Sequence, residues 1–229
     1  MNKHIVKAYD EDLESLHGLI HHMGELTIKQ IDKAFQSILE KNDAMASEVI
    51  ADDDEINLLE TKVDALAMRI LALRQPVASD LRTVVAALKI SNQVERIADY
   101  ARNIAKQALL LNKLPPSSLI TGLPALLEKP KEMIKKALSS FMTNDVDLAL
   151  HVWQMDEAVD TLYAAYLRQL FDEMILDPKN ISPCTHLLFV AKNIERIGDQ
   201  ATNIAEAVYT MVTGKPFKES EPFKDVDEV

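Results

Sequence analysis

Residues 95–105 read ERIADYARNIA, and residues 195–205 repeat this segment as ERIGDQATNIA, 100 positions further along the chain. A second match lies upstream, where residues 45–53 (MASEVIADD) align with residues 148–156 (LALHVWQMD) at an offset of 103. The second copy has therefore lost about three residues between the two segments, near an expected helix connection. Self-similarity at a nearly fixed spacing is typical of an internal duplication, so the chain is predicted to consist of two related halves.

The composition of both halves is typical of helical proteins. The 229 residues include only five glycines, and long stretches are rich in Ala, Leu, Ile, Glu and Lys. Runs that alternate apolar and polar residues, as strands do, are few. We expect six helices, within about two to four residues at each end, at residues 10–40, 44–73, 77–110, 122–143, 145–176 and 184–212. Short connections predict an all-α fold made of two tandem repeats of an antiparallel three-helix bundle, related by a pseudo-twofold axis.

A run of prolines and serines marks the boundary between the halves. Residues 115–118 read PPSS and are followed by Gly122, a combination that favours a loop. We place the first repeat at residues 1–112, a linker at 113–122 and the second repeat at 123–213. Residues 214–229 are polar and contain proline, and they are predicted to form a flexible tail.

The net charge limits which partners the protein can bind, and the cysteine content indicates its location in the cell. With 25 basic and 36 acidic residues, the formal charge of −11 repels nucleic acid and favours cations or basic protein surfaces. Cys184 is the single cysteine, and residues 1–13 lack the apolar core of a signal peptide, so we expect a cytoplasmic protein. The longest apolar runs, such as residues 84–88, are far shorter than the roughly 20 residues that cross a bilayer. Membrane contact is therefore expected to be peripheral at most.

Carboxylates lie one helical turn apart at matching places in both halves. Glu95 and Asp99 share one face of their helix, opposite its apolar stripe, and Glu195 and Asp199 repeat this arrangement. The preceding helix of each half adds a second polar stripe, formed by Asp53, Asn57, Glu60 and Asp64 in the first half and by Asp156 and Asp160 in the second. If these helices pack side by side, each repeat brings about four carboxylates and amides to one surface groove.

Such a groove suits a hard cation, because oxygen-only ligands bind Mg, Ca, Mn or iron, whereas closed zinc sites usually include His or Cys. An ordinary solvated acidic face is the alternative interpretation. The neighbouring Arg96 and Arg196 could balance the acidic charge or form ion pairs within the bundle.

A di-iron oxidase was also considered, because Glu14 and His17 have the Glu-x-x-His spacing that di-iron bundles use twice. The second copy is missing, since Ala98 and Gly198 stand where a His would follow Glu95 and Glu195. We therefore expect His17 and its neighbour His21 on a solvated helix face. Gly-rich phosphate-binding loops are absent, so a conventional enzyme is not expected.

Residues 74–82 (RQPVASDLR), followed by the two Glu-Arg-Ile-x-Asp segments, resemble the PhoU family of phosphate-uptake regulators over nearly the whole chain. The resemblance implies two three-helix bundles, often in a homodimer, with carboxylate motifs that hold clusters of iron or of manganese, magnesium or zinc. It also implies partners: the ATPase subunit of the phosphate ABC transporter and a membrane sensor histidine kinase. The implied function is to repress phosphate uptake and the phosphate-starvation response, with a carboxylate-bridged metalloenzyme as the alternative.

By motif match, the metal positions implied by the resemblance are Glu95, Asp99, Asp156, Asp160, Glu195, Asp199 and Asp53. The first copy departs from the family pattern at Asn57, where an acid is expected, and at Ala98, where a glycine is expected. We therefore expect the stronger site in the second repeat.

Overall fold

The structure is a computed structural model that describes residues 2–115 and 118–218, with side chains from Tyr9 onward. Six α-helices make up most of this part of the chain, and two short 3-10 helices connect them. Their bounds are α1 (Asn2–Leu39), α2 (Asp43–Arg74), α3 (Ala78–Leu111), η1 (Ser118–Gly122), α4 (Leu123–Thr143), α5 (Val146–Leu176), η2 (Pro178–Asn180) and α6 (Ile181–Thr213). No strand occurs among the residues described, so the predicted all-α fold is confirmed.

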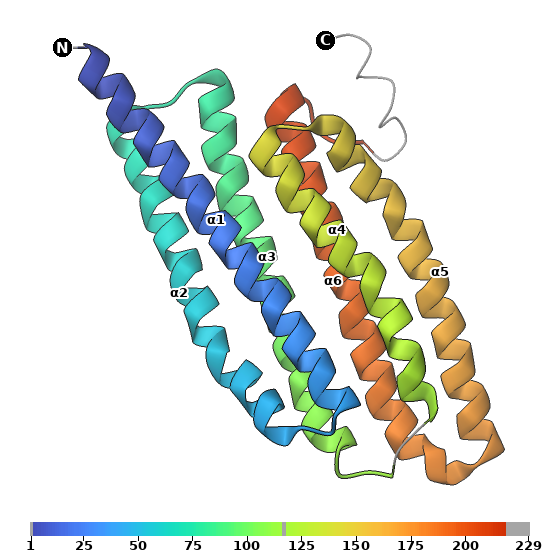
Figure 1. The fold of residues 1–229 in the computed structure, drawn as a ribbon. Helices are drawn as coiled ribbons and strands as arrows, with labels where there is room; N and C mark the ends of the chain where they lie inside the picture. Colours follow the sequence, from blue (N-terminus) through green and yellow to red (C-terminus); the bar gives the residue numbers. More distant parts are fainter. Residues whose placement is uncertain (1, 116–117, 219–229) are drawn as a thin grey trace.

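The helices form two adjoining three-helix bundles, α1 to α3 and α4 to α6 (Figure 1). The third helices, α3 and α6, pack against each other in the middle, while α2 and α5 lie at the outer edges. Near one end of this interface the side chain of Gln107 contacts His186 at 2.8 Å, and near the other end Arg82 bonds to Met211. Rising residue numbers in α3 thus face falling numbers in α6, so the two helices are antiparallel and the repeats are related by a pseudo-twofold axis.

The two repeats share one apolar core. Ile97 and Ile197, the equivalent isoleucines of the duplicated segments, are both fully buried. Burial of one such side chain stabilises the fold by about 1.5–3 kcal/mol. The apolar stripes that the sequence predicts for α3 and α6 therefore belong to this common core.

The second helix of each repeat begins with the same kind of cap. Asn42 and Asp145, which correspond at the offset of 103, both have extended backbone angles. Their side-chain oxygens accept the backbone N–H of Met45 at 3.0 Å and of Leu148 at 2.9 Å. A side-chain acceptor at this position satisfies one of the free N–H groups of the first turn. The duplication has thus preserved the start of both helices.

Helix boundaries agree with the expected ones within the stated margin except at one N-terminus. The first helix begins at Asn2 rather than near residue 10, whereas the last begins at Ile181, three residues before the expected start. In the last helix Pro183 occupies the first turn, where its missing N–H loses no hydrogen bond. Residues 116–117 of the expected linker and 219–229 of the expected tail lie outside the described residues. The described start of that tail contacts α5 and α6 through Phe217, whose ring lies 5.5 Å from Trp153 and 5.4 Å from Tyr209.

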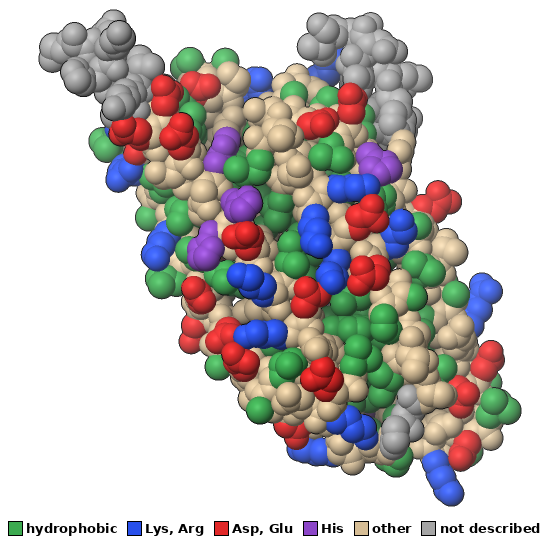
Figure 2. Space-filling view, in the orientation of Figure 1, with side chains coloured by type: hydrophobic (Ala, Val, Ile, Leu, Met, Phe, Trp, Pro, Cys, Tyr) green, Lys and Arg blue, Asp and Glu red, His purple; other side chains and the backbone are tan. Residues whose placement is uncertain are grey.

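The face shown in Figure 2 belongs to α1 and α4, and acidic and basic side chains are intermixed on it. An ion pair between Lys131 of α4 and Asp32 of α1 joins the repeats here. Among the residues described, no helix is apolar over enough of its length to span a membrane.

Candidate carboxylate sites

Each repeat has one cluster of carboxylates, which lies between its second and third helices. We call Asp53 of α2 with Glu95 and Asp99 of α3 the first cluster. The second cluster consists of Asp156 and Asp160 of α5 with Glu195 and Asp199 of α6. The fold thus brings the seven carboxylates named from the sequence into two groups, while their role as metal ligands stays a prediction.

In the first cluster a guanidinium lies between the two helices. Arg102 of α3 donates one hydrogen bond from Nη1 to Asp53 and forms an ion pair through Nη2 with Asp99 at 2.6 Å. The side chain of Asp53 is only 3% exposed, and Asn57 donates a further bond to it over 3.5 Å. Arg102 therefore holds a carboxylate from each helix.

Burial, together with neighbouring negative charge, raises the pKa of two carboxylates of the first cluster. Burial, followed by the charges of Asp99, Glu60 and Asp53, raises the pKa of Glu95 to about 7. Burial also raises the pKa of Asp53, even though Arg102 opposes the shift. A single guanidinium is therefore not enough to offset the loss of water around these groups.

The second cluster has a different counter-ion. Lys192 of α6 lies 2.6 Å from Oε2 of Glu195, and it also lies 5.5 Å from the centre of the Tyr163 ring in α5. Within the part of the chain that the structure describes, Asp156, Asp160 and Asp199 form no ion pair within 4.0 Å. Lys192 thus forms an ion pair with only one of the four carboxylates of the second cluster among the residues described.

The second cluster is correspondingly short of positive charge. Burial and the charges of Asp160, Asp199 and Glu195 raise the pKa of Asp156 to about 6. The pKa of Asp199 is raised by burial and by Glu195, whereas Lys192 and Arg196 oppose the shift. These four carboxylates are close enough to repel one another, and a cation placed among them would relieve that repulsion.

Neither cluster is closed around an ion as it stands. In residues 2–115 and 118–218 no three His, Cys, Asp or Glu side chains are arranged so that they could hold a metal ion. The first cluster does not fit a metal, because Arg102 already lies between Asp53 and Asp99 and pairs with both. The second cluster fits a hard cation by the chemistry of its oxygen donors, provided that the carboxylates close upon the ion.

Two expectations about individual residues are wrong. Asp53 was expected at a surface groove, but it is 2% exposed because it points from α2 toward α3 and Arg102. His17 was expected on a solvated face, but it packs edge-on against Phe141 of α4 at 4.9 Å, and burial lowers its pKa. His21 is exposed, as expected.

The sequence did not reveal which cations contact the clusters, although the charge of Arg196 does oppose the rise that burial causes in the pKa of Asp199. Arg96 and Arg196 were the candidates, yet both are exposed, and Arg196 lies over the ring of Tyr100 at 5.9 Å. The cations in contact with the clusters are Arg102 and Lys192 instead. Their spacing of three residues from Asp99 and from Glu195 was the available signal, because residues three apart are neighbours on a helix.

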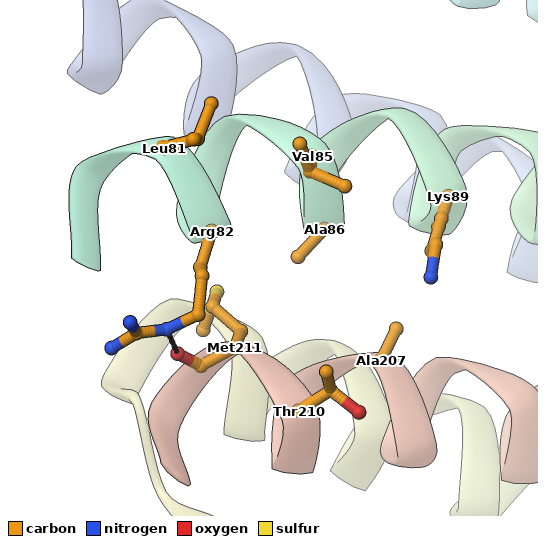
Figure 3. Close-up of a pocket in the computed structure, with 8 residues that line it drawn as sticks. All are labelled: Leu81, Arg82, Val85, Ala86, Lys89, Ala207, Thr210 and Met211. Atoms are coloured by element: carbon orange, nitrogen blue, oxygen red, sulfur yellow. Dashed lines mark hydrogen bonds between the residues drawn. The ribbon is translucent and has the colours of Figure 1, made fainter. Parts of the chain in front are cut away.

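A groove of about 210 Å³ lies between α3 and α6, away from the carboxylates of both clusters, none of which lines it (Figure 3). Leu81, Val85 and Lys89 form its α3 side, and Ala207, Thr210 and Met211 form its α6 side. Arg82 crosses it and donates its Nε hydrogen to the backbone carbonyl of Met211 at 2.8 Å. The 74–82 segment is thereby fastened to the end of the opposite repeat.

The duplicated fold and its paired carboxylate helices place this chain in the class of tandem three-helix-bundle proteins. The PhoU domain model matches residues 20–108 and 123–208, one match in each repeat. The chain therefore belongs to the PhoU family, and the resemblance seen in the sequence is confirmed.

Relatives and solved structures agree with this membership. A phosphate-specific transport system accessory protein PhoU homolog from Zymomonas mobilis is 44% identical over 223 residues, which cover 97% of this chain and 94% of that protein. The Caulobacter vibrioides homolog is 41% identical over 227 residues, covering 99% of both chains. The crystal structure of PhoU from Pseudomonas aeruginosa has a TM-score of 0.85 at 35% identity, covering 90% of this chain and all (100%) of that one. A phosphate transport system regulatory protein PhoU from Streptococcus pneumoniae also has a TM-score of 0.85, at 26% identity, covering 92% and 99% of the two chains.

Proposed function

We propose that this chain is a non-catalytic cytoplasmic adaptor that represses phosphate uptake and the phosphate-starvation response. It acts by contacting the ATPase subunit of the phosphate ABC transporter and the phosphate sensor histidine kinase. The observation that carries the proposal is similarity over the full length to phosphate-specific transport accessory proteins, at 44% and 41% identity. The relation extends across both repeats, so it includes every surface that the fold presents to a partner.

The 74–82 segment supports a contact surface at the end of the first repeat. It is held at both ends, because Arg74 donates two hydrogen bonds to Asp12 of α1 at 2.9 and 3.0 Å and Arg82 bonds to Met211. Between these anchors Val77 is 74% exposed. Ala78 has a φ of 50° at the start of α3, an uncommon conformation for alanine, whereas the same angle at Gln75 is the usual left-handed ending of a helix. Backbone strain that is firmly held is typical of functional segments, so we assign partner contact to this one.

The second carboxylate cluster supports a role for a divalent ion in this protein. Asp156, Asp160, Glu195 and Asp199 would hold iron, manganese, magnesium or zinc, with oxygen as the only ligand atom. The ion would offset the repulsion among these carboxylates and fix α5 against α6. We propose a structural or sensory ion that shapes the partner surface, and a homodimer as the working form.

Binding measurements with purified components test the adaptor proposal. We expect the chain to bind the transporter ATPase and the cytoplasmic part of the sensor kinase, and the Val77→Glu variant to lose tenfold or more in affinity for at least one of them. Ile175→Glu is the matched control, because Ile175 is 80% exposed near the equivalent connection of the second repeat. Equal binding by both variants and the wild type would remove the assignment of the 74–82 segment. Failure of the wild type to bind either partner would refute the adaptor itself.

A further inference from the structure

The two repeats differ at the position that governs charge in each cluster. Arg102 of α3 and Thr202 of α6 occupy equivalent places in the duplicated segment, 100 residues apart. The same repeat comparison pairs Asn57 with Asp160 at the offset of 103. At these two positions the first cluster thus has a guanidinium and an amide, where the second cluster has a hydroxyl and a carboxylate.

Arg102 occupies the space that an ion would need. Its two terminal nitrogens hold Asp53 on α2 and Asp99 on α3 at the same time. Charge-assisted hydrogen bonds of a planar guanidinium are directional and strong, and Asp53 is nearly inaccessible to water. A divalent ion could enter only by breaking both contacts, and it would then lie beside a like charge.

Thr202 does not take the place of Arg102 in the second cluster. Its hydroxyl donates to the backbone carbonyl of Asp199 at 2.7 Å, within its own helix, so it neither crosses to α5 nor supplies charge. Lys192 does not replace the guanidinium, because its ammonium bonds to Glu195 and its side chain is 40% exposed. A flexible, hydrated ammonium at the edge of the cluster is able to move aside for an ion.

We propose that Arg102 is the resident cation of the first repeat, so that the first cluster is complete without metal and only the second cluster takes a divalent ion from solution. The inference rests on the proposed metal site of the second repeat and specifies which half of the molecule uses it. One half of the duplicated protein is then a fixed structural unit, and the other half changes with the ion supply.

Exchange of the two residues tests this assignment. Mn²⁺ bound per chain is measured by equilibrium dialysis and by electron paramagnetic resonance for the wild type, Arg102→Thr, Thr202→Arg and the double exchange. We expect Arg102→Thr to bind more Mn²⁺ than the wild type and Thr202→Arg to bind less. The double exchange should bind more Mn²⁺ than Thr202→Arg, because the site has moved to the first repeat, but less tightly than the wild type, because Asn57 stands there in place of Asp160.

The arms of the experiment separate the two proposals. If the wild type binds Mn²⁺ and Arg102→Thr binds no more, Arg102 is not the excluding group, and the inference is overturned while the site in the second repeat stands. If the wild type binds none and Arg102→Thr does bind, the site in the second repeat fails and the role of Arg102 is supported. If no variant binds Mn²⁺, both proposals are overturned.

Folding of Arg102→Thr needs its own measurement, because the exchange leaves Asp53 buried without its cation. We expect this variant to unfold at a lower temperature than the wild type in EDTA and to recover most of the loss when Mn²⁺ is added. Recovery by Mn²⁺ supports the inference, and an equal response of the wild type and the variant to Mn²⁺ contradicts it. The Thr202→Arg arm leaves the first repeat unchanged and therefore stays informative if Arg102→Thr does not fold.

Discussion

Arg82, in the first turns of α3, donates its Nε hydrogen to the backbone carbonyl of Met211, in the last turn of α6, across 2.8 Å. The last carbonyls of a helix have no partner within the helix, so this bond supplies one from the other repeat. The guanidinium also lies against Gly214, where an added Cβ would be 3.4 Å from Cζ of Arg82. One side chain of the first repeat thus stabilises the end of the last helix of the second.

Replacement of Arg82 by leucine tests this link between the repeats. We expect Arg82→Leu to lower the free energy of unfolding by about 1–2 kcal/mol, because a charge-assisted bond is lost and a carbonyl is left without it. Urea denaturation measures the change. Arg168→Leu is the control, since Arg168 is exposed on α5. An equal effect of the two substitutions would show that the Arg82 contact adds nothing to stability.

Substitution of Gly198 by alanine should stabilise the protein. A Cβ at this position would meet Val159 at 3.5 Å and Asp156 at 3.6 Å, which are ordinary contacts, and the first repeat already has Ala98 there. Alanine in a helix interior is favoured over glycine by about 0.5–1 kcal/mol. Thermal unfolding in EDTA measures the gain, with Gly18→Ala as the reference because nothing lies within 4 Å of its added Cβ. A loss of stability for Gly198→Ala alone would mean that α5 and α6 pack too closely for a methyl group.

The carboxylate clusters predict a pH dependence of stability in metal-free protein. The pKa of Glu95 is raised from 4.5 to about 7, chiefly by burial, so between these values the folded state keeps a proton that the unfolded chain has released. Stability should therefore fall as the pH rises from about 5 to 7, and acidification within this window should restore it. Asp156, with a pKa of about 6, adds to the same trend.

Glu95→Gln should reduce this slope, because glutamine has no proton to release. The expected gain at pH 8 is on the order of 1 kcal/mol, less than the full pKa shift implies, since water screens a carboxylate that is partly exposed. Unfolding in urea at several pH values, with EDTA present, measures it. Glu157→Gln, at an exposed glutamate of α5, serves as the control. A slope that is unchanged in Glu95→Gln would show that another group titrates in this window.

Much of the fold follows from features that act within a few residues. The apolar stripe around Ile97 and Ile197 predicts which face of α3 and of α6 is buried, and both isoleucines are fully buried. The expected helices at 122–143 and 145–176 meet at Asn144, and the structure places this residue between α4 and α5, with Asp145 as the cap. Local rules suffice here, because caps and stripes depend on the helix itself.

The candidate site was less predictable, because it depends on how one helix is rotated against the next. The spacing of Asp53 does not reveal that the side chain turns toward α3 and is buried under Arg102. Nor does sequence decide between Arg96 and Arg102 as the counter-ion, since both lie next to the acidic stripe. Ala98, where a glycine was expected, needs no change in packing, because a Cβ at the equivalent Gly198 makes only ordinary contacts, and its effect on the first site stays a prediction.

The central claim, that this chain restrains phosphate uptake, is tested most directly by the rate of labelled phosphate uptake in phosphate-replete cells that lack the gene. We predict that deletion raises uptake and starvation-gene output, and that the wild-type chain and Ile175→Glu restore repression while Val77→Glu does not. Uptake and starvation-gene output that stay at the wild-type level after deletion would contradict the account.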